Sequence, residues 1–273
     1  MAYIFMPDIG YTEQLGSQMH NFAVMYAIGK KTGHKLAIHE SSLDVGKGQR
    51  GFIEAFDYPI TILGSGSYNE ICVKPMPQCY LDVDADIINI NPDLSYAIRR
   101  RFDYSFCYWI HLLDEIINNL FVFRKEHIIK ATAFYDTLKT NKKVVSMHFR
   151  RTDYLYASGL NLSLNYYIEA LTHFNKENYQ ILVFSDDIEW CKTTLPGAFS
   201  GWDMVFSENN STYVDMYLMS MCHSNIIANS TFSSWGAWFN RHSDKKVISP
   251  EQIIPAELDL NKIFPGRIFL KTV

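Results

Sequence analysis

Apolar and polar residues follow two alternating patterns through the second half of the chain. Short apolar runs, which are typical of buried strands, lie at 144–149, 180–184, 203–206, 225–228 and 247–249. Apolar residues at helical spacing lie between these runs, over 164–174, 187–195, 212–222 and 233–240. Strands that alternate regularly with helices predict an α/β fold with a parallel sheet and right-handed crossovers.

The beginning of the chain shows the same pattern once. Residues 3–6 and 35–39 are predicted strands, and the apolar residues of 19–27 have helical spacing. Ser17 is a suitable N-cap for this helix and Gly33 a suitable end. A strand–helix–strand unit of this kind is Rossmann-like. It lacks the full glycine fingerprint of dinucleotide-binding proteins, so the sequence gives little support for NAD or FAD.

Glycine and proline are scattered through the region between these two parts. The elements predicted there are short strands at 61–63, 71–73 and 87–90 and helices at 109–120 and 125–138. The polar stretch 140–143 is the best candidate for a linker. We therefore expect two domains, residues 1–141 and residues 142–273, each of ordinary size.

Composition narrows the possible partners and the compartment. The net charge of −4 argues against general nucleic-acid binding. The five cysteines lack metal-ligand spacing and fit a reducing compartment better than a disulfide framework. The N-terminus lacks the basic region of a signal peptide, and no apolar run is long enough to span a membrane. These features together predict a cytoplasmic protein.

Charged residues follow the predicted strand at 144–149. His148 lies at its end, and Arg150, Arg151 and Asp153 come directly after it. Ligands in open α/β sheets bind outside the carboxyl ends of strands, and arginine meets phosphate oxygens through two parallel hydrogen bonds. The stretch therefore indicates a phosphate or pyrophosphate site. The alternative is a strand end with solvated arginines, one of them paired with Asp153.

Two further strand ends carry polar residues. Ser185, Asp186 and Asp187 end one strand, and their carboxylates are able to accept hydrogen bonds from ribose hydroxyls or guanine N–H groups. The stretch 229–234 leads into a helix, where hydroxyls, free N–H groups and the helix dipole favour an anion. The alternative is ordinary helix capping, by Asp187 in the first case and by Ser233 or Ser234 in the second.

A single parallel sheet would bring the three strand ends to one edge. Guanidinium groups, carboxylates and a helix N-terminus at one place predict a site for a nucleoside diphosphate. The sequence contains no cluster with metal-ligand spacing, so we expect no metal and no cofactor. The arginines and the helix dipole would then have to stabilise the charge of a departing nucleotide.

These three strand ends resemble the motifs of glycosyltransferase family 11, the α-1,2-fucosyltransferases. His-Phe-Arg-Arg-Thr-Asp-Tyr at 148–154 is similar to the first family motif, and Phe-Ser-Asp-Asp-Ile-Glu-Trp-Cys-Lys at 184–192 to the second. The stretch 215–238 is similar to the third. Near the N-terminus, Leu-Gly-Ser-Gln-Met at 15–19 stands where the family usually has G-L-G-N-Q-M.

The resemblance implies two Rossmann-like domains that face one another across a cleft, the GT-B arrangement. It implies an inverting, metal-independent transfer of L-fucose from GDP-β-L-fucose to a hydroxyl of a glycan, typically the 2-OH of galactose. It also implies a cytoplasmic enzyme that acts on lipid-linked glycans in polysaccharide biosynthesis, which allows peripheral association with the inner face of the membrane. The oligomeric state stays open.

The resemblance also assigns roles to residues. Arg150 would contact the β-phosphate, with His148 and Asp153 as further catalytic candidates. Asp186 or Asp187 would bind the guanosine. The expected donor-side residues are Arg150, Arg151, Ser185, Asp186, Asp187, Asn229, Ser230, Thr231, Phe232 and Ser233. The expected acceptor-side residues are Gly16, Ser17 and Gln18 in the first domain.

Several alternatives stay open from the sequence. Thr152 replaces the usual glycine of the first motif, where related fucosyltransferase families are similar to this sequence. Ser17 replaces the usual asparagine of the N-terminal motif, and this second change leaves the acceptor and the linkage open. Asp153 is either the base for the acceptor hydroxyl or a residue that orients an arginine. The rival functions are transfer of another GDP-sugar, transfer to another hydroxyl, and a catalytically silent nucleotide- or glycan-binding protein.

Overall fold

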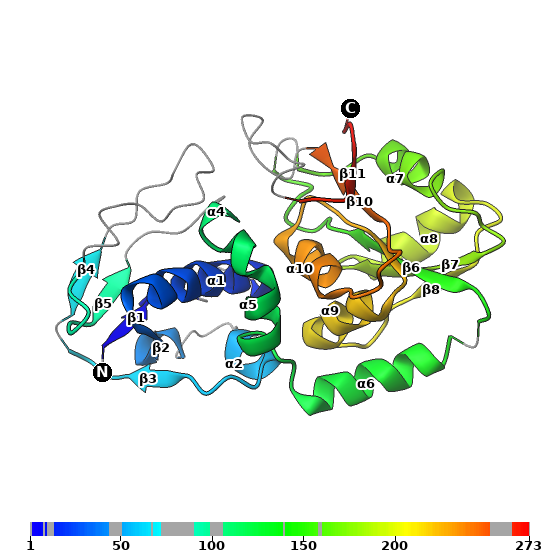
Figure 1. Cartoon of the computed structure of the whole chain (residues 1–273). Coiled ribbons are helices and arrows are strands. Elements are labelled where there is room, and N and C mark those ends of the chain that lie inside the picture. The colour runs from blue at the N-terminus through cyan, green and yellow to red at the C-terminus, as the bar shows by residue number, and fades with distance from the viewer. Residues whose placement is uncertain are drawn as a thin grey trace. The chain divides into compact units, whose positions relative to one another are not determined.

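The chain divides into two compact units, Met1–Arg124 and Lys125–Val273 (Figure 1). The computed structural model describes residues 2–7, 9, 14–43, 51–66, 68–71, 90–98, 106–138, 140–157, 160–251 and 264–272. Residues 87–89 of the predicted strand at 87–90 and residues 72–73 of the one at 71–73 lie outside these residues.

The first unit contains a five-stranded parallel sheet in the order β3-β2-β1-β5-β4. Its strands are β1 (Tyr3–Phe5), β2 (Lys35–His39), β3 (Thr61–Leu63), β4 (Asn69–Ile71) and β5 (Tyr96–Ile98). Helix α1 (Leu15–Thr32) joins β1 to β2 and ends at Gly33, whose φ of 80° suits a residue without a side chain. The prediction of Ser17 as N-cap is wrong, because the N-cap residue is Gln14, three residues earlier, and Ser17 lies inside the helix.

The predicted single helix at 109–120 is interrupted. The chain instead forms α4 (Phe106–Trp109), the 3₁₀ turn η2 (Ile110–Leu112) and α5 (Leu113–Asn119). The backbone leaves the helical region at Trp109, whose indole is fully buried and packs edge-on against His20. Burial of this large side chain has overridden the helical periodicity. The remaining short elements among the described residues of the unit are η1 (Glu40–Ser42) and α2 (Gly51–Ala55).

The second unit contains a six-stranded sheet, and every strand pair in it is parallel, as predicted. The strand order is β11-β10-β9-β6-β7-β8. The strands are β6 (Lys143–Phe149), β7 (Tyr179–Ser185), β8 (Met204–Phe206), β9 (Ser224–Ile226), β10 (Val247–Pro250) and β11 (Arg267–Leu270). Strand β11 was not predicted from the sequence.

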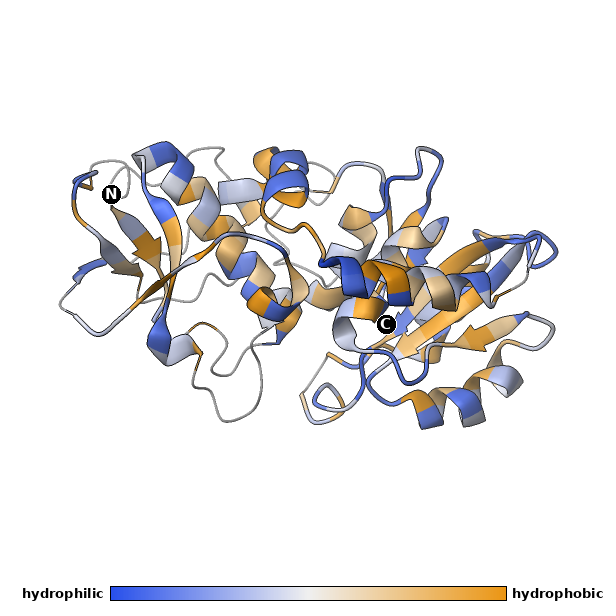
Figure 2. Cartoon of the chain, turned by 90° about the horizontal axis from the view of Figure 1, so that it is seen from below, coloured by the Kyte–Doolittle hydropathy of each residue, from blue (hydrophilic) through white to orange (hydrophobic). Residues whose placement is uncertain are grey.

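Helices cover both faces of this sheet, whose strands are mostly hydrophobic (Figure 2). The helices are α6 (Lys125–Asp136), α7 (Leu164–Leu171), α8 (Ile188–Ala198), α9 (Thr212–Met221) and α10 (Thr231–Phe239). Val145, Met147 and Phe149 of β6 form a core with α7 and α8. Val144 forms a second core with α6 and α9. Consecutive residues of β6 therefore point to opposite layers, as the strand period requires.

Helix α6 groups with the second unit. Ala131 belongs to the core that α6 shares with α9, and the ring of His127 packs against Tyr213. The division into compact units thus falls after Arg124, before α6. The domain boundary expected after residue 141 stays a prediction.

The order in which the strands are added to this sheet reverses at β6, while the strands stay parallel. The chain adds β7 on one side of β6 and later returns to add β9 on the other side. Ligands in open α/β sheets bind at such a switch point, outside the carboxyl ends of the strands. The topology thus brings together the segments that follow Phe149, Ser185 and Ile226.

Candidate active site

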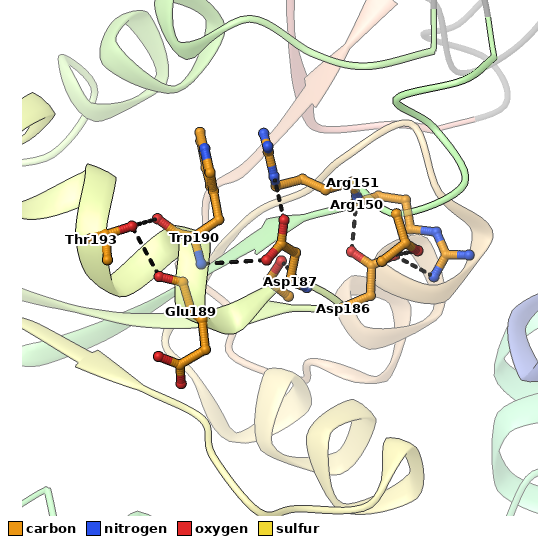
Figure 3. A network of polar contacts seen from close by, with 9 residues as sticks. Arg150, Arg151, Asp186, Asp187, Glu189, Trp190 and Thr193 are labelled. Atoms are coloured by element: carbon orange, nitrogen blue, oxygen red, sulfur yellow. Dashed lines mark hydrogen bonds and ion pairs between the residues drawn. The ribbon is translucent and has the colours of Figure 1, made fainter.

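The two adjacent arginines after β6 point in opposite directions (Figure 3). His148 and Phe149 already lie on opposite faces of the sheet, and this alternation continues into the arginines. Arg150 turns toward Asp186 and Asp153, whereas Arg151 turns toward Asp187 and helix α8. Only Arg150 is therefore directed as expected for a phosphate ligand at the switch point.

Arg150 is paired with two carboxylates. Its Nη1 lies 3.1 Å from Asp186 Oδ2, and its Nη2 lies 2.8 Å from Asp153 Oδ1. The guanidinium also lies over the ring of Tyr154, with Cζ 5.5 Å from the ring centroid. Its side chain is only 14% exposed, so these partners determine its orientation.

Asp186 connects the ends of β6 and β7. Its Oδ1 accepts a hydrogen bond from the backbone N–H of Arg151 at 2.8 Å, and its Oδ2 accepts one from the Thr152 hydroxyl at 2.5 Å. With the Arg150 ion pair, this carboxylate has three partners. The threonine that replaces the family's glycine thus has a local use, because it fixes Asp186.

Arg151 is a structural partner of helix α8 in this arrangement. Its Nε donates to Asp187 Oδ2 at 3.1 Å, and its Cζ lies 3.4 Å from the centroid of the Trp190 ring. Asp187 Oδ1 in turn accepts a hydrogen bond from the Trp190 N–H, which confirms Asp187 as the N-cap of α8. Ser185 accepts a hydrogen bond from the N–H of Asp187.

His148 is buried beside this cluster. Burial lowers its pKa to about 3, and the nearby Arg150 acts in the same direction, against the opposite influence of Asp186. The imidazole is therefore neutral at physiological pH. Within the described residues its buried Nδ1 has no hydrogen-bond partner, and its ring lies 5.4 Å from that of Phe232.

Asn229 holds the loop that follows β6. Its carbonyl accepts a hydrogen bond from the Tyr154 hydroxyl at 3.2 Å, and its Nδ2 donates to the carbonyl of Leu160 at 2.9 Å. The two contacts fix both ends of the segment between Tyr154 and Leu160. In the described part of the chain, Asn229 Oδ1 is buried and has no partner.

Helix α10 begins at Thr231, with Ser230 as its N-cap residue. The expected caps Ser233 and Ser234 are wrong, because both lie inside the helix. The Ser233 hydroxyl donates within the turn, to the carbonyls of Ser230 and Ala228. Since no side chain caps this end, its first N–H groups stay available to an anion.

The expected acceptor-side residues lie in the first turn of α1, in the first unit. Gly16 and Gln18 are buried, and Ser17 is partly exposed. Gln18 Oε1 accepts a hydrogen bond from the N–H of Phe52 at 3.3 Å, which joins α1 to α2. Gln18 thus has a structural role within its own unit, and a role toward an acceptor stays a prediction.

The described side chains of the site carry an unexpected charge balance. Arg150 and Arg151 face three carboxylates, those of Asp153, Asp186 and Asp187. With His148 neutral, the cluster has one more negative than positive charge. Neither this balance nor the contacts of Tyr154 and Trp190 were predicted from the sequence. The only signal for Trp190 was its position three residues after a capping aspartate, where its N–H meets the carboxylate.

The described residues contain neither a metal-ligand cluster nor a membrane-spanning helix. No group of three or more His, Cys, Asp or Glu side chains there is arranged to hold a metal ion. No helix there is both long enough and apolar enough to cross a membrane.

The fold defines the class of protein. A solved structure of the α-1,6-fucosyltransferase NodZ, soaked with GDP-fucose, matches 87% of this chain and 92% of its own chain, with a TM-score of 0.54 at 14% sequence identity. The chain has two α/β units, each with a parallel sheet, and it therefore has the fold of the GT-B glycosyltransferases. The sequence model of Glycosyl transferase family 11 matches residues 95–257. The chain belongs to this family.

The sequence relatives of this chain include transferases whose names give an α-1,2 linkage. An α-1,2-colitosyltransferase of Escherichia coli is 42% identical over 130 residues, which cover 44% of this chain and 44% of the relative. Galactoside α-(1,2)-fucosyltransferase 2 of Mus musculus is 24% identical over 241 residues, which cover 82% of this chain and 65% of the relative. The matched part is less than two thirds of either relative.

Proposed function

We propose that the protein is an inverting fucosyltransferase that moves L-fucose from GDP-β-L-fucose to a hydroxyl of a glycan, the 2-OH of galactose. The observation that carries this proposal is the position of Arg150 in a chain of family 11. It lies at the switch point of the sheet and is fixed by Asp186. The names of the α-1,2-linking relatives support the linkage.

The chemistry asks for stabilisation of two charges. Positive charge grows on the sugar in an oxocarbenium-like transition state, while negative charge grows on the departing GDP. A guanidinium that is already oriented stabilises the second charge without reorganisation. Arg150 supplies this group, the first N–H groups of α10 supply further donors, and the neutral ring of His148 closes the site beside Phe232.

Calorimetry tests the donor site first. Wild-type protein is titrated without metal with GDP, GDP-fucose, GDP-mannose and UDP-galactose, and transfer to a β-galactoside is followed by mass spectrometry, with NMR to assign the linkage. We expect binding of GDP and GDP-fucose, an α-1,2 product, and no change on addition of EDTA. Binding of UDP-galactose alone, or of no nucleotide, would contradict the proposal.

Replacement of Arg150 tests the mechanism. Arg150→Ala should reduce turnover by about 100-fold or more, because a preorganised donor to the leaving group is lost. Its circular dichroism spectrum should match that of the wild type. Turnover near the wild-type level in this variant would remove Arg150 from the reaction.

A second donor is favoured by one comparison. The relative with 42% identity is named as a colitosyltransferase, so family members of this similarity differ in the sugar they transfer. A parallel titration and transfer assay with GDP-colitose decides between the two sugars. A higher kcat/KM with GDP-colitose than with GDP-fucose would change the donor and leave the nucleotide site as proposed.

A further inference from the structure

Both terminal nitrogens of Arg150 are already paired with carboxylates, so an incoming pyrophosphate would have to compete with them. Its Nη1 is paired with Asp186 and its Nη2 with Asp153, and the neighbouring Arg151 is paired with Asp187. The pyrophosphate of a sugar nucleotide adds at least two negative charges to a cluster that already has a surplus of one. Since like charges at this distance repel strongly, one carboxylate has to leave Arg150 when the donor binds.

The contacts indicate which carboxylate leaves. Asp186 is held by Arg150, by the backbone N–H of Arg151 and by the Thr152 hydroxyl, and its side chain is 19% exposed. Asp153 is 57% exposed, and Arg150 is its one ion-pair partner among the described residues. The other contacts of the Asp153 carboxylate are to the adjacent backbone N–H groups of Asp153 and Tyr154. Displacement of Asp153 from Arg150 therefore breaks one ion pair of an exposed side chain, whereas displacement of Asp186 would break an ion pair and move a carboxylate that two further hydrogen bonds hold.

We propose that Asp153 is a displaceable counter-ion of Arg150: the donor pyrophosphate takes its place at Nη2, and the released carboxylate becomes the base for the acceptor hydroxyl. This inference rests on the proposed function. Asp186 stays paired with Nη1 and keeps the guanidinium oriented. Asp153 lies on the loop that Asn229 fixes through Tyr154 and Leu160, so the released side chain stays beside the site.

The exchange makes Asp153 a better base. Burial raises its pKa, but the hydrogen bond and the attraction to Arg150, with smaller contributions from the backbone N–H groups of Asp153 and Tyr154, outweigh burial and hold the pKa below its usual value. Loss of this partner therefore raises the proton affinity of the carboxylate. The acceptor oxygen bonds to C1 of fucose, and the bond from C1 to the β-phosphate oxygen breaks. Its electron pair stays on GDP, and the hydroxyl proton passes to Asp153.

This exchange predicts that the donor binds before the acceptor reacts. The base is masked by Arg150 until the donor is bound, so an acceptor that arrives first meets a carboxylate whose proton affinity is low. Asp153 therefore has two effects: its charge competes with GDP for Arg150, and its carboxylate serves as the base once GDP-fucose has displaced it. Removal of the Asp153 charge should strengthen GDP binding and abolish the action of the base. A residue that served only to orient Arg150 would weaken GDP binding when replaced.

The test compares Asp153→Asn with the wild type and with Asp203→Asn. Asp203 is a suitable control because it is also an exposed, ion-paired aspartate, 3.8 Å from Lys142 Nζ, at the start of β8. Calorimetry without metal gives the Kd of GDP, and steady-state kinetics give kcat with GDP-fucose and a β-galactoside. We expect Asp153→Asn to bind GDP about tenfold more tightly, equivalent to about 1.4 kcal/mol. Its kcat should fall by about 100-fold.

Asp153→Ala should show the same two changes, and Asp203→Asn should show neither. GDP affinity in Asp153→Asn that is equal to or weaker than that of the wild type overturns the exchange. A kcat near the wild-type value overturns Asp153 as the base. If wild-type protein binds no GDP, the proposed function fails as well. Normal wild-type transfer with unchanged GDP affinity in Asp153→Asn defeats this inference alone.

Discussion

The two arginines of the first motif differ in role because a strand alternates its side chains. Arg150 follows the face of His148 and meets Asp186, whereas Arg151 follows the other face and meets Asp187 and Trp190. The sequence predicted one anion site from both residues. It could not show that three aspartates, from two loops far apart in the chain, neutralise both of them.

Lysine substitutions should separate the two roles. Arg150→Lys should reduce kcat by about 100-fold, because a single ammonium cannot hold Asp186 and a phosphate together. Arg151→Lys should reduce kcat less than tenfold but lower stability by about 1 kcal/mol, since it loses the stacking on Trp190 and the Nε contact to Asp187. Kinetics and urea unfolding measure the two effects. Equal losses of kcat in both variants would contradict the division of roles.

Asp215 should make the stability of the second unit depend on pH. Burial raises its pKa to about 7, against the opposing hydrogen bond from Ser207 at 2.6 Å. The folded state therefore holds a proton that the unfolded state, with a pKa near 3.8, has released between these pH values. This contribution to stability is present below about pH 4 and is lost as the pH rises through 7.

Asp215→Asn should abolish this dependence, because the amide keeps a hydrogen bond to Ser207 and does not titrate. Thermal unfolding of both proteins at several pH values between 4.5 and 8.5 measures it. The Tm of the variant relative to that of the wild type should rise with pH. Parallel curves would show that Asp215 titrates at its ordinary value.

At the scale of elements, the turn after α1 depends on a glycine. A Cβ on Gly29 would lie 2.7 Å from the carbonyl oxygen of His34, which is backbone and cannot move aside easily. Gly197 in α8 has no atom within 4 Å of a Cβ position and is a matched control. Gly29→Ala should destabilise the protein by about 1–3 kcal/mol, and Gly197→Ala should stabilise it by about 0.5–1 kcal/mol. Urea unfolding that ranks the variants in the other order would contradict this account.

Many of the helices and strands were predictable because the spacing of apolar residues within each short segment indicates them. The parallel sheet and the cap at Asp187 follow from short apolar runs and from one carboxylate at a helix start. The interruption at Trp109 did not follow, since it depends on where a large indole finds room to be buried. Strand β11 was missed although the turn residues Pro265 and Gly266 precede it, because its first residue, Arg267, is charged yet buried.

At the scale of the whole molecule, the candidate donor site is built by one unit. Arg150, Asp186 and Asn229 follow three strands of the second sheet, and Ser230 is the N-cap residue of a helix of the same unit, with no capping hydrogen bond from its side chain. The segments meet because β6 lies at the switch point, between β7 and β9. The first unit contributes none of these groups, and its predicted acceptor residue Gln18 is engaged with Phe52.

Binding of GDP should therefore slow hydrogen exchange in the second unit. Hydrogen exchange on the full chain, with GDP at about 100 times its Kd, should make opening of the second unit about 100-fold rarer. The strongest protection should lie at 147–155, 184–188 and 228–234, the segments that carry the predicted phosphate and nucleoside ligands. The strands β1, β2 and β3 of the first unit should exchange as in the free protein, because no donor ligand is assigned to them.

Arg150→Ala serves as the control, since it should lose the protection with GDP and keep the exchange pattern of the free protein. Equal protection of β1 and β6 in the wild type would instead make the first unit part of the nucleotide site, and the assignment of donor binding to one unit would fail.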